Sequence, residues 1–357
     1  MTKNLKFAAF AAAGVAAAGL LAPLPAAAQD VTLTVASWGG AYSASQRNAF
    51  YIPYKAEFGV TILEDEWQGQ IAQIRVQVET GVYKWDIIDG EQDIILAGCD
   101  EGILAEIDYD LMGGREQFFD GAALDCGIAN ITWSTIYAYD GEVFPASGEV
   151  PSTVFDFFDT EKFPGYRGLY KSVPKITLEW ALIADGVAMD EVYDVLATDE
   201  GVDRALAKLD TIKDSVVWWE SGAQSVQILA DKEVVMTTSW NGRIYNAVAN
   251  EGKDFPIVWD AQGLEFDFWF MPAGGPNQEE AMKFIAWAEQ PEIQKNQSKF
   301  IAYGPTTAAA AALIPDEILV DLPTAPANTK NVLTVDNAFW ADRREELQEI
   351  WNAWLAK

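Results

Sequence analysis

The chain has 357 residues, of which 12% are aromatic, and its formal net charge is −30 at pH 7. A field this negative repels nucleic acid and anionic lipid, so we expect no nucleic-acid partner, and the surface charge chiefly serves solubility. Histidine is absent, which excludes His-assisted nucleophiles, His-ligated metals and histidine proton relays. We therefore expect neither a metal site nor another cofactor.

The first 28 residues are predicted to be a secretory signal peptide. Lys3 and Lys6 precede an apolar run of about 16 residues, shorter than the ~20 residues that a membrane-spanning helix needs. The small residues Ala26–Ala28 then provide a cleavage site before Gln29. Removing two lysines and no acid changes the net charge from −30 to −32. We therefore expect a periplasmic protein, large enough for two lobes with separate cores.

After this leader, predicted strands alternate with predicted helices. The strands are expected at 31–36, 60–63 and 85–88, and the helices begin near Ser43 and cover 70–80 and 94–99. The first helix is expected at Ser43 because Ser43 and Gln46 have capping-box spacing. This β-turn-α repeat predicts an α/β fold with a mostly parallel sheet, whose loops at the carboxyl ends of the strands face a ligand.

The rest of the chain continues the α/β pattern. Residues 131–139 form a predicted aromatic strand that is long enough to run from one lobe into the other. Further elements are a helical region at 151–212, strands at 216–219, 234–240 and 266–272, and a terminal amphipathic helix at 336–356.

Cys99 and Cys126 are the two cysteines of the chain. In an exported protein an isolated pair most often forms a disulfide, and this one would contribute about 3–4 kcal/mol through the entropy of the unfolded chain. Two buried free thiols are the alternative. The spacing does not suggest a zinc site.

Aromatic residues gather at the ends of predicted strands and in the turns that follow them. In α/β proteins these ends meet the ligand, and aromatic faces attract cations. For any single ring, a place in the core is an equally good interpretation, although Trp38 and Trp240 each adjoin a glycine turn. The set consists of Trp38, Tyr42, Trp218, Trp219, Trp240, Trp269 and Tyr303.

Charged residues occupy the same loops. Glu91 and Asp93 lie in a turn, where solvation is the simpler explanation for an acid. Asp267 differs because it lies inside an apolar strand, and a buried charge must be paired, for example by a bound ammonium. Arg243 follows a strand and a glycine, where its guanidinium could hold a carboxylate. The alternative is that Asp267 and Arg243 pair with each other.

Four segments, in their order and spacing, resemble the periplasmic polyamine-binding proteins of ABC importers. They are 37–42 (SWGGAY), 85–88 (WDII), 239–243 (SWNGR) and 302–306 (AYGPT). The resemblance covers essentially the whole mature chain. It implies a type II-like periplasmic binding fold of two α/β lobes that are joined by hinge strands and close over a ligand. It implies no catalysis, an ABC permease in the inner membrane as partner, and a monomer.

On this resemblance, lobe 1 is expected to contain 29–137 and about 268–312. Lobe 2 is expected to contain 138–267 and about 313–357. The long strand at 131–139 then crosses the boundary between them, as a hinge strand would.

The ligand positions implied by the resemblance match unevenly. Trp38 and Tyr42 match a first aromatic cluster, Trp240 an aromatic wall, Asp267 an acid that grips an amine, and Tyr303 a late tyrosine. Glu91 and Asp93 replace a serine and a tyrosine, and the middle acid pair is lost around 173–176. Arg243 is foreign to a polyamine site but resembles a branch that binds γ-aminobutyrate (GABA). The ligand is therefore expected to be an amino acid or similar zwitterion, with a polyamine as the alternative.

Three other functions compete with this interpretation. A secreted hydrolase could use Glu91 and Asp93, but a carboxylate pair must be held ~5–9 Å apart across a cleft, which residues two apart on one turn fit poorly. A ferric-binding protein needs clustered tyrosines, and no adjacent pair of tyrosines occurs. A sugar-binding protein would also use tryptophan and acids, but Asp267 together with Arg243 favours a charged ligand.

Overall fold

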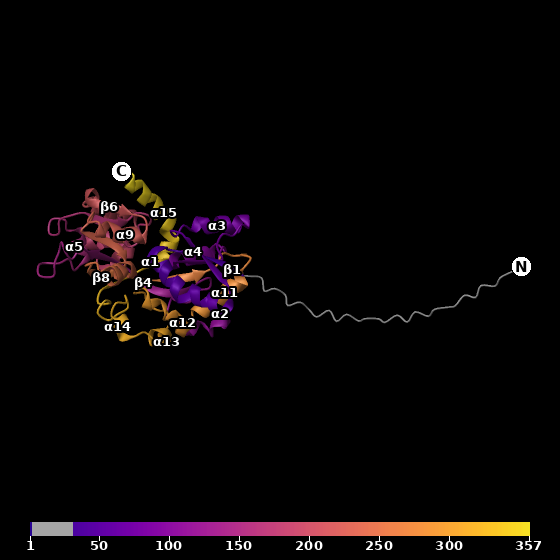
Figure 1. Ribbon diagram of the computed structural model, residues 1–357. Helices are drawn as coiled ribbons and strands as arrows, with labels where there is room; N and C mark the ends of the chain where they lie inside the picture. Colours follow the sequence, from indigo (N-terminus) through magenta and orange to yellow (C-terminus); the bar gives the residue numbers. More distant parts are fainter. Residues whose placement is uncertain (2–30) are drawn as a thin grey trace. The chain divides into compact units, whose positions relative to one another are not determined.

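The computed structural model describes Met1 and residues 31–357, and residues 31–357 form one unit (Figure 1). Beyond Met1, the predicted signal peptide lies outside the described residues. Among the helices at 31–357, none is long and apolar enough to cross a membrane.

A single mixed sheet runs through this unit. Its order is β2-β1-β3-β8-β4-β7-β5-β6, and β9 pairs with β8. The strands are β1 (Thr32–Ser37), β2 (Thr61–Glu66), β3 (Ile87–Glu91), β4 (Ile128–Tyr139), β5 (Arg167–Tyr170), β6 (Val216–Trp219), β7 (Met236–Trp240), β8 (Ile257–Phe270) and β9 (Val332–Thr334). At one end β1 is parallel to β2 and β3, and at the other β5 is parallel to β6 and β7. The two ends are joined by antiparallel pairing of β4 and β8.

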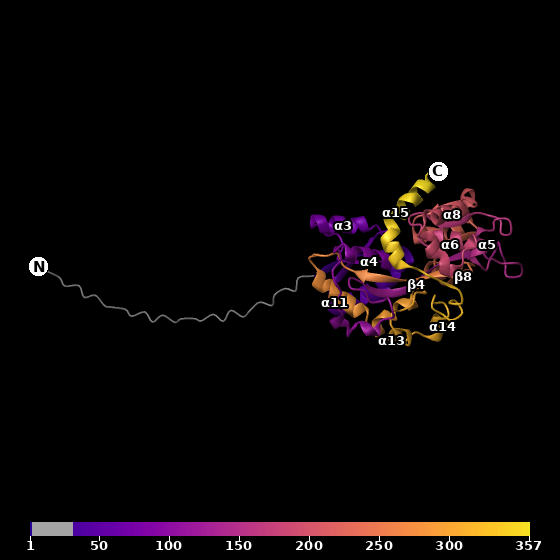
Figure 2. The same ribbon diagram turned by 180° about the vertical axis from the view of Figure 1, so that it is seen from behind.

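Helices cover the sheet (Figures 1 and 2). The first group is α1 (Gly40–Gln46), α2 (Ile52–Phe58), α3 (Ile71–Thr80), α4 (Gln92–Asp100), α5 (Val154–Phe158), α6 (Thr177–Ala184), α7 (Val192–Leu196) and α8 (Asp199–Asp210). The second is α9 (Gly222–Ala230), α10 (Asn241–Glu251), α11 (Gln278–Ala288), α12 (Pro291–Gln294), α13 (Ala308–Ala311), α14 (Asp316–Leu319) and α15 (Asn337–Leu355). The first helix begins at Gly40 rather than near Ser43, because Gly39 and Gly40 both adopt positive φ and turn the chain earlier.

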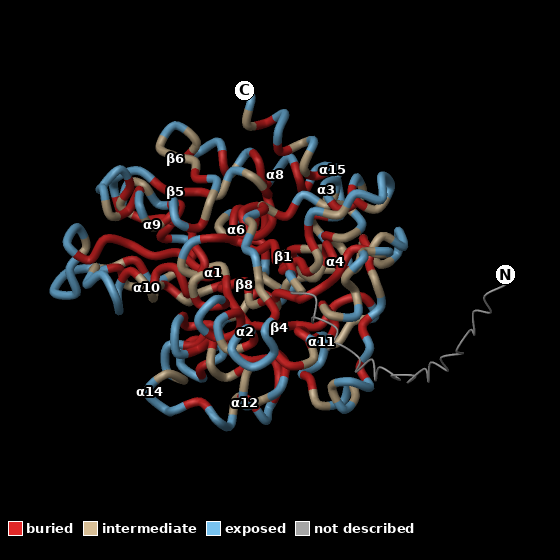
Figure 3. The backbone as a smooth tube through the Cα atoms, turned by 45° about the vertical axis from the view of Figure 1, so that its right-hand side comes forward, coloured by how far each residue is buried: buried red, intermediate tan, exposed pale blue. Residues whose placement is uncertain are grey.

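Buried hydrophobic side chains form separate clusters along the sheet, and most residues of β4 and β7 are buried (Figure 3). One cluster draws on 33–129 and 268–288. A second draws on 137–258 and on α15, which contributes Trp340, Trp351 and Trp354. A third cluster, in which seven of the sixteen buried residues are aromatic, joins residues near the ends of β1 and β7 to residues within β4. The lobe boundaries expected from the sequence remain a prediction.

Two further features connect the elements. Cys99 at the end of α4 forms a disulfide with Cys126, just before β4, with a Cα–Cα distance of 5.7 Å, which confirms the predicted bridge. Strand β4 contributes Ile128 to the first cluster and Tyr137 to the second. The register between β4 and β8 shifts twice along the way. The predicted long strand therefore does run from one core to another, beside β8.

Candidate functional site

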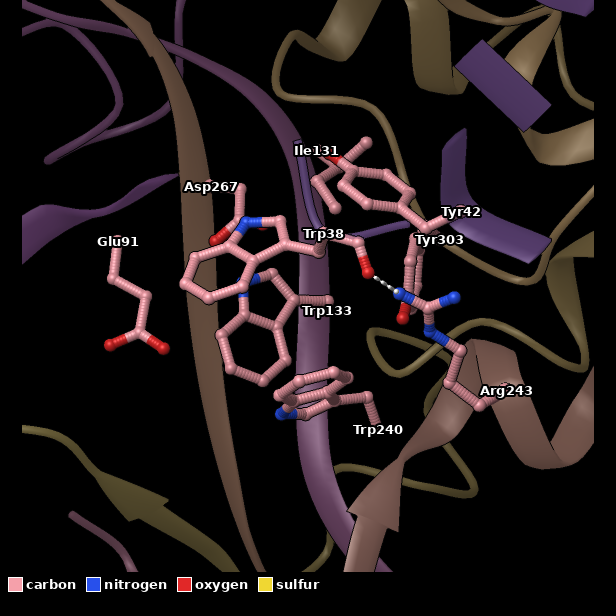
Figure 4. Close-up of a pocket in the computed structure, with 9 residues that line it drawn as sticks. All are labelled: Trp38, Tyr42, Glu91, Ile131, Trp133, Trp240, Arg243, Asp267 and Tyr303. Atoms are coloured by element: carbon pink, nitrogen blue, oxygen red, sulfur yellow. Dashed lines mark hydrogen bonds between the residues drawn. The ribbon is translucent and has the colours of Figure 1, made fainter. Parts of the chain in front are cut away.

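A small cavity lies where β1, β3, β4, β7 and β8 come together (Figure 4). Its walls come from strand ends and from the turns and helices that follow them, as an α/β ligand site requires. The lining residues are Trp38, Tyr42, Glu91, Ile131, Trp133, Trp240, Arg243, Asp267 and Tyr303. Every residue predicted from the sequence as ligand-binding, apart from Asp93, therefore lines one cavity.

Aromatic rings form the walls of this cavity. The ring centroids of Trp38 and Trp240 are 6.0 Å apart, and Trp133 packs edge-on to Trp240 at 6.2 Å. Tyr42 and Tyr303 make a second edge-to-face pair at 5.3 Å. Such contacts fix the rings in one arrangement and present their faces to a ligand, where they can attract a cation.

Asp89, at the centre of β3, anchors the aromatic wall from behind. The side chain is fully buried, and it accepts hydrogen bonds from Trp38 Nε1 at 3.0 Å and Tyr42 Oη at 2.7 Å. Gln46 Nε2 and Asn130 Nδ2 also donate to it, at 2.7 and 2.6 Å. Burial raises the pKa of Asp89 to about 6, although these donors work in the opposite direction. Asp89 thus fixes two ligand-facing rings.

Asp267 lies on β8 within the cavity wall and is 5% exposed. The strand positions it opposite Glu91 on β3 and opposite Ile131 on β4. Its Oδ1 atom has no hydrogen-bond partner among the described residues. Burial raises the pKa of Asp267 well above its ordinary value, and the negative charges of Asp89 and Glu91 raise it further.

Arg243, in the first turn of α10, lies across the cavity and is 3% exposed. It donates to the backbone oxygens of Gly39 at 2.7 Å and Trp38 at 3.0 Å, while its Nε has no partner at 31–357. No carboxylate of the described chain lies within 4.0 Å of its guanidinium, so it does not form an ion pair with Asp267. Burial lowers the pKa of Arg243. In Figure 4 the two residues lie on opposite sides of the tryptophan rings.

Glu91 and Asp93 belong to a buried ion cluster beside the cavity. Lys175 Nζ lies 3.3 Å from Glu91 and 3.1 Å from Asp93, and it also contacts Glu265. Arg344 on α15 pairs with Asp93 as well. Asp93 is therefore turned away from the cavity, and its predicted contact with a ligand finds no support in this geometry. Two acids that share one ammonium also differ from the separated carboxylates of a hydrolase.

Sequence reasoning missed three residues of the site. Ile131 and Trp133 are two residues apart on β4, so their side chains point to the same face of the sheet. This spacing was already visible in the predicted strand. Asp89 precedes Glu91 by two residues and shares its face, but an acid beside a glycine in a turn reads as solvated. At residues 31–357 no group of acids, cysteines or histidines is arranged to hold a metal ion.

The cavity thus offers a carboxyl group and a guanidinium, both buried and neither bound to an opposite charge, with aromatic rings between them. This arrangement can bind a small molecule that has a positive and a negative end.

The chain is similar to known binding proteins in sequence and in fold. The GABA-binding protein of Pseudomonas aeruginosa is 42% identical over 339 residues, which are 95% of each chain. A solved GABA receptor structure is 31% identical with a TM-score of 0.80, covering 91% of this chain and 98% of its own. The PBP MotA from A. tumefaciens B6, in complex with glucopine, is 32% identical with a TM-score of 0.84, covering 92% of this chain and 100% of its own.

The family described as "Bacterial extracellular solute-binding protein" matches residues 49–327. Together with the relative that is 42% identical across almost the whole length, this match decides the classification. The chain belongs to the bacterial extracellular solute-binding proteins.

Proposed function

We propose that this chain is the periplasmic receptor of an ABC importer and that it captures GABA or a closely similar zwitterion. The ligand ammonium binds Asp267, and the ligand carboxylate binds Arg243. The observation that carries this proposal is the pair of buried, opposite and mutually unpaired charges in one cavity. Family membership and the names of the relatives support it.

The energetic argument is that each charge costs several kcal/mol to bury alone. Asp267 shows this cost in its raised pKa, and Arg243 shows it in its lowered pKa. A ligand with an ammonium at one end and a carboxylate at the other neutralises both at once. The rings of Trp38, Trp133 and Trp240 exclude water around the ligand and thereby strengthen both ion pairs.

The same charges disfavour a polyamine. A diamine would bring its second ammonium towards the guanidinium of Arg243, which repels it. The remaining acid of the lining, Glu91, already lies 3.3 Å from Lys175. A linear diamine therefore has one well-placed acid rather than two, and its affinity should be lower.

The test is calorimetric titration of the mature protein with GABA, putrescine, spermidine and glucose. GABA should bind most tightly. Arg243→Ala should weaken GABA binding at least tenfold while weakening putrescine binding less, because only GABA has a carboxylate to lose. Glu317→Gln, an exposed acid on α14, is the matched surface control and should bind like the wild type. Tighter binding of putrescine than of GABA, or an equal loss of both in Arg243→Ala, would overturn the assignment.

A further inference from the structure

Two carboxyl groups of the site lie side by side. In the β3–β8 pairing Glu91 is opposite Asp267 and Asp89 is opposite Trp269, so Asp89 and Asp267 are diagonal neighbours on one face of the sheet. Both are buried, and the negative charge of Asp89 raises the pKa of Asp267. Because two neighbouring buried carboxylates repel each other when both are ionised, this arrangement favours a proton on one of the two groups.

The surrounding donors identify which group holds the proton. Trp38 Nε1, Tyr42 Oη, Gln46 Nε2 and Asn130 Nδ2 all donate to Asp89. No donor at 31–357 reaches Oδ1 of Asp267. A buried carboxylate is stable only when hydrogen bonds or a cation compensate its charge. Asp89 is therefore the anion of the pair.

We infer that, in the empty protein, Asp267 carries a proton that it donates to Asp89, and that the ligand's ammonium replaces this proton, so that one proton leaves for each ligand bound. The Asp267 O–H bond breaks, the proton passes to solvent, and the carboxylate that remains accepts from the ammonium. Asp89 keeps its four hydrogen-bond donors throughout. It holds its negative charge next to Asp267 without touching the ligand. This inference rests on the proposed function, since it takes Asp267 as the ammonium site.

The other charged and titratable groups around the pair favour a retained proton. They are Tyr42 on α1, Glu91 on β3, Glu265 on β8, Glu289 at the end of α11, Tyr303 in its loop and Arg243 on α10. The acids disfavour a second negative charge on the Asp89–Asp267 pair, and Arg243 is the one cation in this group of residues. Burial raises the pKa of Asp267 well above its ordinary value, and the neighbouring acids raise it further.

The sign of the pH dependence follows from this scheme. The ammonium lowers the pKa of Asp267 in the complex, so binding releases a proton at any pH between the bound and empty values. Above about pH 6, where Asp89 is ionised, the Kd should therefore fall about tenfold for each pH unit. The gain in affinity ends at the pH at which Asp267 of the empty protein has lost its proton. The ligand amine stays charged until about pH 10.

The first experiment is calorimetric titration of the mature protein with GABA at pH 7 in phosphate and in Tris, whose ionisation enthalpies differ. The difference in observed enthalpy should correspond to about one proton released per ligand. Asp89→Asn should reduce this number, because Asp267 loses the neighbouring negative charge that favours its protonated form in the empty protein. Glu317→Gln should leave it at one. Tight GABA binding with no proton released would overturn the inference.

A second measurement does not need the ligand. Carbon NMR of labelled aspartate carboxyls in the empty protein should show one group that is protonated at pH 7 and is missing from Asp267→Asn. An ionised Asp267 at pH 7 would overturn the inference even if Asp89→Asn does not fold. If no amine binds at all but the protonated carboxyl is present, the proposed function fails while the proton assignment stands.

Discussion

At the residue scale, the unequal distribution of hydrogen-bond donors separates two buried aspartates that otherwise look alike. Asp89 is surrounded by donors, so its charge can persist without a ligand. Asp267 lacks such donors, so its charge becomes favourable only when a cation arrives. The same contacts tie Asp89 to Trp38 and Tyr42, and they therefore couple the acid at the centre of β3 to the shape of the aromatic wall.

Replacing Asp267 with asparagine should separate binding from stability. Asparagine keeps the shape but cannot carry the negative charge, so GABA affinity should fall by about 2–5 kcal/mol, roughly 30- to 5,000-fold. The pKa of Asp267 is raised on folding, so its ionised form opposes folding increasingly as pH rises above the unfolded value. The melting temperature of empty Asp267→Asn at pH 7 should therefore equal or exceed that of the wild type. A clear drop would show that Asp267 stabilises the empty fold instead.

The sequence was informative about this site wherever a local pattern carried the signal. Trp38 and Trp240 were found because each adjoins a glycine turn at a strand end. Asp93 was misjudged because its partner Arg344 lies far away in the chain and meets it only in the folded state. Asp89 was missed for the same reason, since Asn130 reaches it from β4. The binding roles of the cavity residues remain predictions.

At the element scale, a buried ion cluster ties five parts of the fold together. Lys175 precedes α6, Glu91 ends β3, Asp93 is on α4, Glu265 is on β8, and Arg344 is on α15. Three acids face two cations, so one acid is in excess. Burial opposes ionisation of Asp93, yet Arg344 and Lys175 lower its pKa to about 2, whereas burial raises the pKa of Glu265 to about 8. Figure 2 shows α15 between α4 and the helices α6 and α8.

The backbone beside this cluster is strained. Ile176, which directly follows Lys175, has φ of 68°, a region that β-branched residues rarely occupy. Its side chain packs over Gly263 of β8, where an added Cβ would lie 2.5 Å from Ile176 Cδ1. The strain is maintained because Lys175 is anchored on one side and the glycine leaves room on the other.

Replacing Lys175 with methionine should destabilise the protein. The acids would lose their central cation, and breaking a buried ion cluster in this way costs about 3–5 kcal/mol. Urea unfolding at pH 7 measures the loss. Because the acids left behind can be neutralised by protons, the deficit should be smaller at pH 5 than at pH 8.

The matched control is Lys283→Met, whose lysine lies on α11 with 48% of its side chain exposed and pairs with surface acids. Its unfolding free energy should change by no more than about 0.5 kcal/mol. Equal losses in the two variants would contradict a special role for the buried cluster.

The order of strands and helices was predictable, because each element has its own periodicity. The direction of the central strands was not. Strands β4 and β8 are antiparallel neighbours although more than a hundred residues separate them along the chain, and no local pattern records such pairing. The disulfide was predictable because an exported chain with a single pair of cysteines most often joins them, and the structure confirms the bridge.

At the scale of the whole molecule, β4 and β8 connect two cores, and the candidate site lies beside them. The expected two-lobed periplasmic binding fold is confirmed by solved relatives that align over more than nine-tenths of the chain, such as the MotA complex with a TM-score of 0.84. The family expectation is confirmed as well. Where one lobe ends and the next begins stays a prediction, because two strands are shared between the cores.

Burial of the site argues for motion between the cores. Asp267 and Arg243 are 5% and 3% exposed, so a zwitterion cannot reach them unless the walls separate. Separation is easiest at β4 and β8, where the register shifts at Ala129/Ile131 and at Thr135/Tyr137 leave the pairing irregular. Each core can stay intact while these two strands bend, which is the hinge closure known for two-lobed receptors.

Small-angle scattering should detect this closure. Saturating GABA should reduce the radius of gyration of the mature wild-type protein, because the ligand's two charges pull Asp267 and Arg243 from opposite sides of the cavity. Asp267→Asn, which lacks one of these charges, should keep the larger radius at the same GABA concentration, while Glu317→Gln should close normally. If the wild-type radius is the same with and without bound GABA, the ligand enters through local side-chain movements and the hinge is not part of binding.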